Sequence, residues 1–502
     1  MRWVRGRRFW GVAVAVGVLL GGGVAAGARA EEPANPSAPG AALAQACAAA
    51  GLASLPTVGP ATCKGVDSLA VLLATTCERL PVPPLACSDL TDGRPIDPAA
   101  VTTFANGWVP RALRLQGLLD EDQPLRNEQV PHTHNSFNAA QYGPSVTTGD
   151  PNQRYTMTDQ LRMGIRALEM DVHWVPLPTG LPTTLTDRTN HVVLCHGDVV
   201  QVGSLSLHVG CSVDRPLGPG LDEVAAFLRS PGNEHEVVYL YLENQLDGDP
   251  TAHAATVALL QQHLGSLVQR PTGTTPGHCQ DLPMAETRAQ LLAEGHRVIL
   301  MGNCGPGAWS SWVYQRGAGW DEHGNSTPYP AFPACTADRA ARGYDQHLIR
   351  VTEDSTFVSA LSGSPAPITE PEVRAMVRCG VDWIGMDRIG PNDPRLADLV
   401  WSWAPGQPSG AGACAAWGSD ARFRAAPCGG LRRVACRTTA GGWLVPPKAV
   451  AWGQGAATCH AAGATFDVPR SGWQDEQLRA VGAAVPGGLW ISPSAATGWR
   501  PA

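Results

Sequence analysis

Lysine is nearly absent from this chain of 502 residues, in which Lys64 and Lys448 are the only two. Any cationic contact to a phosphate must therefore come from arginine or histidine. The formal net charge is −7 at pH 7, an acidic balance that disfavours nucleic acid as a partner and tight electrostatic binding to anionic bilayers. The chain also lacks a G-x-S-x-G elbow, a P-loop and a G-x-G-x-x-G turn, so serine-hydrolase, NTPase and dinucleotide-binding functions have no local support.

The first thirty residues have the three parts of a secretory signal peptide. MRWVRGRR is basic, residues 9–27 are apolar and glycine-rich, and Ala28-Arg29-Ala30 is an A-x-A cleavage site. A single membrane anchor is the alternative, which the glycines in the apolar run disfavour. We expect residues 1–30 to be removed, the protein to be secreted to the extracellular space or the periplasm, and no stable membrane insertion to follow.

Fourteen cysteines without a C-x-x-C metal pattern indicate disulfides in an exported chain. Residues 31–42 are predicted to be a linker, and residues 43–124 a helical N-terminal region that includes one helix over 98–119. Four cysteines of this region are expected to form two disulfides of open connectivity: Cys47, Cys63, Cys77 and Cys87.

Strand-like and helix-like runs alternate over residues 125–403, which is typical of an α/β fold. The predicted strands are Glu128–His132, Ile165–Val172, Val192–Cys195, Val237–Leu242, Arg297–Met301, His347–Val351 and Val381–Met386. The predicted helices are Met157–Met163, Leu221–Leu228, Ala252–Leu264, Glu286–Ala293 and Glu370–Val377. Seven strands suit a distorted or incomplete barrel, and equally a barrel with a further strand near Trp309–Tyr314.

Several of these apolar runs end in His, Asn, Glu or Asp, side chains that bind metals or move protons. Glu169 and Asp171 are two residues apart in a strand, so they share one face. Burying two carboxylates there is costly without a partner. A hard cation is the simplest one, and Asn135 and Glu243 could complete an oxygen cage suited to Ca²⁺.

Two histidines, His134 and His196, would flank the same point from two further strand ends, because the strand ends of a parallel barrel meet on one face. Ordinary turn chemistry at strand ends is the alternative for each polar residue taken alone.

Four short motifs, in this order, resemble a known family: THNS (133–136), RALEMD (166–171), CHG (195–197) and LEN (242–244). Together they resemble the calcium-dependent, phosphoinositide-specific phospholipases C of the PLC-like phosphodiesterase superfamily. The resemblance implies a distorted TIM barrel that cleaves the glycerol–phosphate bond of an inositol phospholipid at a membrane surface. It implies a Ca²⁺ ion held by four residues: Asn135, Glu169, Asp171 and Glu243. Metal-free bacterial relatives carry an arginine where this chain has Asp171, which favours the calcium-dependent branch.

The resemblance also implies that His134 and His196 act on the phosphate. We expect intramolecular phosphoryl transfer, in which a hydroxyl of the substrate attacks phosphorus. His196 would protonate the departing glyceryl oxygen. His134 would bind the phosphoryl group or act as the base, and Glu169 is the alternative base.

Three further residues are candidates for orienting the site or binding substrate: Asp387, Arg166 and Arg388. Asp387 could orient His134 by a hydrogen bond, and a simple helix cap is the equal alternative.

Within the barrel region Cys195–Cys211, Cys279–Cys304 and Cys335–Cys379 are plausible disulfides. A nucleophilic Cys195 is disfavoured in an oxidising compartment. Four aromatic residues in the long connection after residue 301 could form a lipid-facing rim, although core packing is the favoured interpretation: Trp309, Trp312, Tyr314 and Trp320.

Residues 404–502 change character and become rich in Trp, Gly, Ala and Cys. They resemble the two halves of a C-type lectin-like domain in reversed order, which implies the disulfides Cys414–Cys428 and Cys436–Cys459. Gln407-Pro408-Ser409 and Phe423-Arg424-Ala425 stand where that family has its sugar-binding motifs, so a structural or adhesive role is favoured over sugar binding.

Two other functions remain open from the sequence. A glycerophosphodiester phosphodiesterase uses the same kind of barrel, but its first strand usually ends in His-Arg-Gly, and Thr133-His134-Asn135-Ser136 stands here. An exported binding protein with an inactive barrel is the second alternative. The particular lipid, the head-group contacts and the oligomeric state do not follow from the sequence.

Overall fold

The structure is a computed structural model that describes residues 96–142, 151–178, 188–196, 199–202, 205–208, 215–317, 320–324, 348–354, 367–410 and 412–501. The predicted signal peptide and linker lie outside these residues, as do the four cysteines between 43 and 90. Cys211 and Cys335 lie outside them too. Cys195 and Cys379 are each disulfide-bonded, and their pairing with Cys211 and Cys335 stays a prediction.

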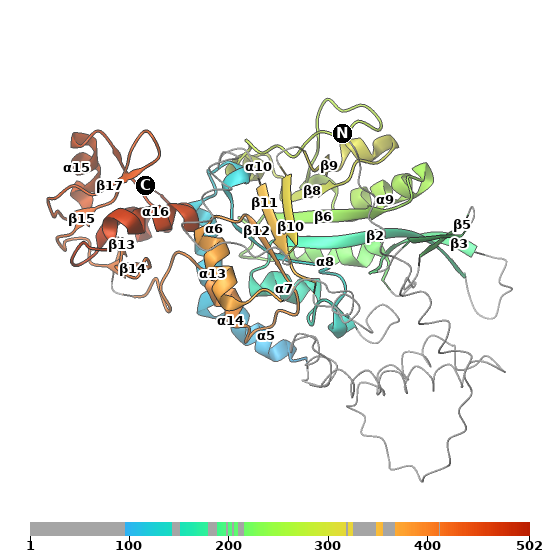
Figure 1. Cartoon of the computed structure of the whole chain (residues 1–502), viewed down its shortest axis with the longest axis horizontal. Helices are drawn as coiled ribbons and strands as arrows, with labels where there is room; N and C mark the ends of the chain where they lie inside the picture. The colour runs from blue at the N-terminus through green and yellow to red at the C-terminus, as the bar shows by residue number, and fades with distance from the viewer. Residues whose placement is uncertain are drawn as a thin grey trace, which may run out of the picture.

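A ten-stranded sheet curls around the centre of the molecule (Figure 1). Its main path runs β10-β11-β12-β1-β2-β6-β8-β7, with β3 beside β2 and β9 beside β8. All pairings are parallel except that of β3. The strands are β1 (Val130–Thr133), β2 (Ala167–Pro178), β3 (Arg188–Leu194), β6 (Val238–Gln245), β7 (Val268–Gln269), β8 (Val298–Gly302), β9 (Tyr314–Gln315), β10 (Trp320–Gly324), β11 (Leu348–Thr352) and β12 (Trp383–Met386).

The last strand of the sheet, β12, pairs in parallel with the first, β1. This pairing brings the ends of the barrel domain together, as in a TIM barrel. In the part of the chain that the structure describes, no strand pairing joins β7 or β9 to β10, so the barrel is open there. The fold is the distorted α/β barrel that the sequence predicts. The open side includes β9, at the end of the segment where a further strand was expected, and the short strands β7 and β10, which were not predicted.

The strands alternate between an inner and an outer face. Leu168, Met170 and Val172 of β2 belong to the large core that also contains the helices. Ala167 belongs instead to the inner core, with Tyr239, Tyr241 and Trp383. Because side chains alternate along a strand, Glu169 and Asp171 face the barrel interior, as predicted.

Helices cover the outer face. Five agree with the predicted runs: α7 (Met157–Met163), α8 (Leu217–Arg229), α9 (Pro250–His263), α10 (Arg288–Ala293) and α13 (Glu370–Arg378). The short α14 (Pro394–Asp398) was not predicted. Their starts follow from local chemistry. Thr156 and Asp249 cap α7 and α9, and α10 and α13 begin with capping boxes. The single helix predicted over 98–119 is wrong: α5 (Pro98–Ala105) and α6 (Trp108–Leu119) are separate, and the chain turns at Asn106-Gly107, where Gly107 is extended.

The strand that precedes His196 differs from the prediction. It was expected to be a parallel barrel strand, but β3 runs antiparallel to β2, from Val172 opposite Leu194 to Pro178 opposite Arg188. The twelve-residue β2 continues past the barrel, and β3 returns along it. Cys195 therefore lies beside Asp171. The Cys195 N–H donates to the Asp171 carbonyl oxygen at 3.2 Å. A second hairpin follows, made of β4 (Val199–Val202) and β5 (Leu205–His208).

The C-terminal region is a separate α+β unit beside α6 and α13 (Figure 1). Its two small sheets have the orders β14-β13-β19-β15 and β17-β16-β18. The strands are β13 (Cys414–Trp417), β14 (Phe423–Ala426), β15 (Arg433–Val434), β16 (Cys436–Arg437), β17 (Trp443–Leu444), β18 (Thr465–Phe466) and β19 (Leu489–Ser494), with helices α15 (Gly455–Ala461) and α16 (Gly472–Gly482). Disulfides join Cys414 to Cys428 and Cys436 to Cys459, the pairs that the lectin resemblance implied, while that resemblance itself stays a prediction.

The C-terminal unit docks on the barrel through α16. The N–H of Gly472 donates to Gln129 Oε1 at 2.5 Å, and the Gln129 amide donates to the carbonyls of Val377 in α13 and Val381 after it. Trp403, which follows the barrel, packs edge-on against Trp499 at 5.1 Å. These contacts fix the unit at the side of the barrel rather than over its mouth.

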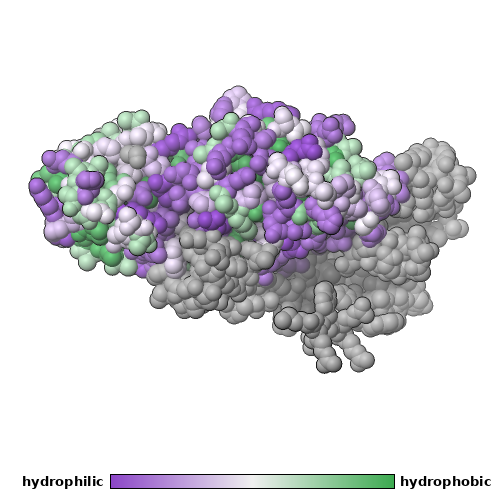
Figure 2. All heavy atoms as spheres, turned by 90° about the horizontal axis from the view of Figure 1, so that it is seen from above, coloured by the Kyte–Doolittle hydropathy of each residue, from purple (hydrophilic) through white to green (hydrophobic). Residues whose placement is uncertain are grey.

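The visible surface is mostly polar, with apolar residues gathered toward the end formed by the C-terminal unit (Figure 2). Among the described residues, the two strongly exposed large apolar side chains, Leu431 and Val481, both belong to this unit. No helix in the described ranges is long and apolar enough to cross a membrane.

Candidate active site

Three carboxylates meet inside the barrel, two from the first half of the long strand β2 and one from near the carboxyl end of β6. Glu169, Asp171 and Glu243 offer oxygens that all lie within 4.8 Å of one another. The register explains this, because Asp171 stands directly opposite Glu243 in the β2–β6 pairing. Asn135 joins them from the end of β1: its backbone turns at φ 43°, and its N–H donates to Glu169 Oε2 at 3.3 Å. The four predicted metal ligands therefore lie together.

The Asn135 side chain suits a cation in this cluster. Its amide oxygen faces both carboxylate oxygens of Asp171, at 3.1 and 3.2 Å, and its nitrogen lies 3.3 Å from His196 Nε2. Three acceptor oxygens that face one another repel unless the amide turns over or a cation lies between them. An all-oxygen donor set is the kind that Ca²⁺ prefers.

The pKa shifts of Asp171 and Glu243 also favour a cation in this cluster. Burial, together with the neighbouring charges of Glu243 and Glu169, raises the pKa of Asp171 well above its ordinary value. Burial and Glu169 likewise raise the pKa of Glu243. Clustered carboxylates resist ionisation together, and a bound divalent ion would remove that resistance.

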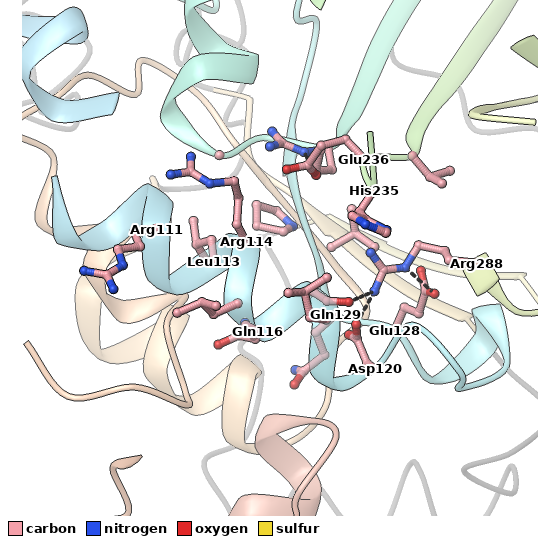
Figure 3. Close-up of a pocket in the computed structure, with 18 of the residues that line it drawn as sticks. Arg111, Leu113, Arg114, Gln116, Asp120, Glu128, Gln129, His235, Glu236 and Arg288 are labelled. Atoms are coloured by element: carbon pink, nitrogen blue, oxygen red, sulfur yellow. Dashed lines mark hydrogen bonds and ion pairs between the residues drawn. The ribbon is translucent and has the colours of Figure 1, made fainter. Parts of the chain in front are cut away.

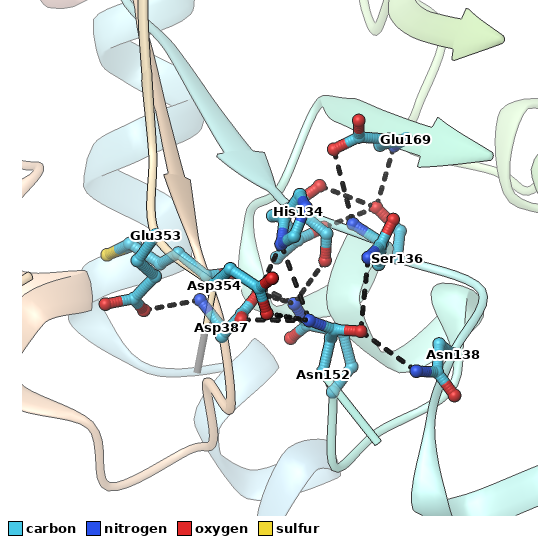
Figure 4. A network of polar contacts seen from close by, with 12 residues as sticks. His134, Ser136, Asn138, Asn152, Glu169, Glu353, Asp354 and Asp387 are labelled. Atoms are coloured by element: carbon cyan, nitrogen blue, oxygen red, sulfur yellow. Dashed lines mark hydrogen bonds and ion pairs between the residues drawn. The ribbon is translucent and has the colours of Figure 1, made fainter. Parts of the chain in front are cut away.

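His134 lies in a network of acids and amides (Figure 4). Its Nδ1 lies 3.3 Å from Asp387 Oδ1. Asn152 bridges the group, since its amide donates to Asp387 at 3.1 Å and to Asp354 at 3.3 Å. Burial opposes protonation of His134, but the charges of Asp387, Glu169 and Asp354 outweigh it and raise the pKa of His134 to about 10. In the metal-free protein the imidazole is therefore a cation near neutral pH.

Asp387 is itself held in place by hydrogen bonds with its neighbours. Its N–H donates to Glu353 Oε1 at 2.5 Å, and Arg395 binds the same Glu353 oxygen at 2.8 Å. Gln153 donates to Asp387 at 3.3 Å and to the His134 carbonyl at 2.7 Å. The helix-cap alternative for Asp387 does not hold, because the following helix, α14, is capped by Asp393.

Sequence reasoning missed a buried arginine under the carboxylates. Arg350 of β11 donates from Nη2 to Glu169 Oε2 at 2.5 Å and from Nη1 to Glu322 Oε1 at 2.6 Å. Its Nε–H points to His132 Nε2 at 3.1 Å. The available signal was a charged residue inside the apolar run Leu348–Val351. Asn152 and Gln153 gave no signal, since they lie in a polar connection.

Of the two predicted arginines, one contacts residues outside this cluster and the other directly follows Asp387. Arg166 immediately precedes β2, and its side chain binds Glu236 at 2.6 Å and the carbonyls of Leu161 and Ile165. The proposal that it orients the site or binds substrate is therefore not supported by its position. Arg388 adopts φ 53° and donates its N–H to the Asn152 carbonyl at 2.7 Å.

Arg166 lines a cavity of about 240 Å³ at the amino ends of the strands (Figure 3). Its wall is a structural ion-pair network, in which Arg288 binds Asp120 and Glu128, and Tyr239 donates to Glu128. Active sites of such barrels lie at the carboxyl ends of the strands, where the carboxylate cluster is.

The aromatic connection packs inward, as the favoured interpretation has it. Trp309, Trp312 and Tyr314 are buried, so they form no lipid-facing rim, and Trp320 stacks on Tyr241 at 6.0 Å. Cys279 and Cys304 are joined by the expected disulfide. Cys195 is disulfide-bonded, which excludes a thiolate nucleophile in this state.

The parallel barrel with its carboxylate cluster and neighbouring histidines defines a domain of the PLC-like phosphodiesterase superfamily. The model of the Rv2075c PI-PLC-like domain matches residues 93–393. The uncharacterized proteins Rv2075c and MT2135 of two Mycobacterium tuberculosis strains are each 36% identical over 506 residues, covering 98% of this chain and 98% of their own. The chain belongs to the Rv2075c PI-PLC-like family.

Solved structures of lower similarity include two bacterial enzymes. The phosphatidylinositol-specific phospholipase C of Listeria monocytogenes is 13% identical with a TM-score of 0.35, covering 58% of this chain and 97% of that one. A mutant of the Staphylococcus aureus enzyme is 12% identical with a TM-score of 0.37, covering 58% and 98%. These values are too low for any function to be inferred from the likeness.

Proposed function

We propose that this protein is an exported, calcium-dependent phospholipase C that cleaves the glycerol–phosphate bond of phosphatidylinositol-like lipids. The observation that carries the proposal is the meeting of Asn135, Glu169, Asp171 and Glu243 next to His134 and His196 at one end of the barrel. The disulfides among the described residues support an oxidising compartment.

The four oxygen-bearing residues would hold one divalent cation. When bound, the ion would lower the pKa of the attacking inositol hydroxyl and offset charge on the phosphoryl oxygens. Glu169 is then the residue that would take the proton of the attacking hydroxyl, through Oε1, because its Oε2 already accepts hydrogen bonds from Arg350 and from the Asn135 N–H.

His134 is arranged to bind the phosphoryl group as a cation. Asp387 accepts from Nδ1, which fixes the ring and leaves Nε2–H as the second donor of the protonated imidazole. A protonated imidazole supplies a charge-assisted hydrogen bond to a phosphate oxygen. The scarcity of lysine makes this contact more important.

His196 is the proposed general acid. It reaches the cluster two residues after the end of the return strand β3, half-buried, with Nε2 beside the Asn135 amide. It would donate a proton to the glyceryl oxygen as the bond to phosphorus breaks. General acid catalysis contributes about 10²–10⁴-fold.

The test is product analysis with purified protein and mixed phospholipid vesicles, with Ca²⁺ or with chelator. We expect diacylglycerol and a cyclic inositol phosphate, formed only with Ca²⁺, and a loss of at least about 100-fold in turnover for His196→Ala. Glycerol phosphate as the water-soluble product would instead identify a glycerophosphodiester phosphodiesterase. No cleavage of any phosphodiester with Ca²⁺ present would contradict catalysis and leave a binding protein.

A further inference from the structure

The carboxylate cluster rests on a chain of alternating charges that ends at the barrel rim. Arg350, 2% exposed, binds Glu169 on one side and Glu322 on the other. Glu322 in turn accepts from Arg316 at 2.6 Å and from the Trp320 indole at 3.3 Å. The side chain of Glu322 is 35% exposed, so the chain runs from the buried site to solvent.

The charges of this chain cancel. Glu169 and Glu322 are two anions, and Arg350 and Arg316 are two cations, each in contact with its neighbour. Asp171 and Glu243 have no arginine, lysine or histidine ion pair among the described residues (the Glu243 carboxylate accepts from the neutral Gln245 amide at 2.7 Å). Two negative charges are thus left uncompensated in the cluster, and they match the charge of one divalent cation.

Arg350 also limits how Glu169 can bind a metal. Oε2 of Glu169 is occupied by the Arg350 guanidinium and the Asn135 N–H. The other oxygen, Oε1, is the one left to face the cluster. A positive charge held this close to the ligand set opposes cation binding, and Glu322 offsets part of that opposition.

We propose that Arg350 and Glu322 are positioning residues that set the metal affinity of the site without touching the ion. Arg350 keeps Glu169 in place and restricts the cluster to one divalent cation. Glu322, from the rim, offsets the Arg350 charge and so keeps the affinity for that cation high. This inference rests on the proposed function, since it concerns the same cation site.

The test is calcium binding by isothermal titration calorimetry, which needs no lipid and no turnover. Glu322→Gln removes a negative charge at the rim and should raise the dissociation constant for calcium by on the order of tenfold. Coulomb's law gives this magnitude for one charge several ångströms from a divalent ion in a partly solvated site. Glu294→Gln is the matched control, because the Glu294 side chain, at the C-cap of α10, is 59% exposed. It should bind calcium as the wild-type protein does.

A double-mutant cycle makes the coupling explicit. Arg350→Gln should tighten calcium binding, because it removes the opposing cation, and Arg350→Gln combined with Glu322→Gln should return the affinity toward that of the wild type. If Arg350→Gln does not fold, the calcium affinity of Glu322→Gln alone tests the role of the Arg350–Glu322 pair.

The outcomes separate the two proposals. Wild-type protein that binds calcium, with an unchanged dissociation constant in Glu322→Gln, would overturn the role of the Arg350–Glu322 pair and leave the proposed function standing. Wild-type protein that binds no calcium would overturn both.

Discussion

Replacement of Asp171 by asparagine should stabilise the metal-free protein while it removes the response to calcium. Asp171 lies within 4.8 Å of the carboxylates of Glu169 and Glu243, and only Glu169 has an arginine partner. Asparagine has nearly the same shape, and its amide nitrogen could donate to the Asn135 oxygen that now faces two acceptors. The change therefore removes repulsion without opening a cavity.

The magnitude follows from the distance. Two unit charges about 4.8 Å apart in a medium of effective dielectric constant about 20 repel by about 3.5 kcal/mol. Proton uptake by the clustered acids relieves part of this repulsion, so we expect a gain of about 1–3 kcal/mol in the free energy of unfolding with chelator present. In a chain of this size that corresponds to a few degrees in Tm.

The assay is thermal and denaturant unfolding of wild type and Asp171→Asn, each with chelator and with excess Ca²⁺. Wild-type protein should gain stability with Ca²⁺ as ligand linkage requires, and the variant should not. Asp222→Asn is the control, because its exposed pair with His263 should contribute less than about 1 kcal/mol. A variant that is less stable than wild type in chelator, or that keeps the full calcium response, would refute the assignment of Asp171.

Three further predictions follow from the same structure. First, the raised pKa values of Asp171 and Glu243 mean that the folded metal-free protein holds more protons than the unfolded chain, so its stability should fall as pH rises from the ordinary carboxyl range through those raised values. Because Ca²⁺ competes with these protons, the gain in Tm on adding Ca²⁺ should be larger near about pH 8 than near about pH 5, and equal gains would argue against a carboxylate site. Second, Asp387→Asn should lower the pKa of His134 from about 10 toward its ordinary value, as measured by NMR titration of the metal-free protein, and should reduce kcat more than it raises KM; an unchanged His134 titration would show that Asp387 does not control the ring. Third, Gly472→Ala places a Cβ 2.5 Å from the Val377 carbonyl oxygen and should destabilise the docking of the C-terminal unit by about 1–3 kcal/mol in denaturant unfolding, whereas Gly453→Ala, with open space around its Cβ, should be nearly neutral.

For the C-terminal unit, the sequence predicted the disulfides but not the contact with the barrel. The cysteine pairs of residues 414–459 followed from a loose resemblance in spacing and are present. The way the unit sits on the barrel did not follow from it. That contact depends on a glycine of α16 close to α13 and on Gln129 between them, and none of these residues is distinctive when read along the chain.

The sequence alone determined those features that depend on residues close together along the chain. Alternation along β2 placed Glu169 and Asp171 on the inner face, capping residues fixed the starts of the helices, and strand-end motifs identified the ligand set. Only the tertiary structure decided the direction of β3, the pairing of Arg166 with Glu236 instead of the cluster, and the pairing of Arg350 with Glu169 from a strand 181 residues away. The physical reason is that strand direction and buried charge compensation depend on partners distant in sequence, and these partners become neighbours only when the sheet closes.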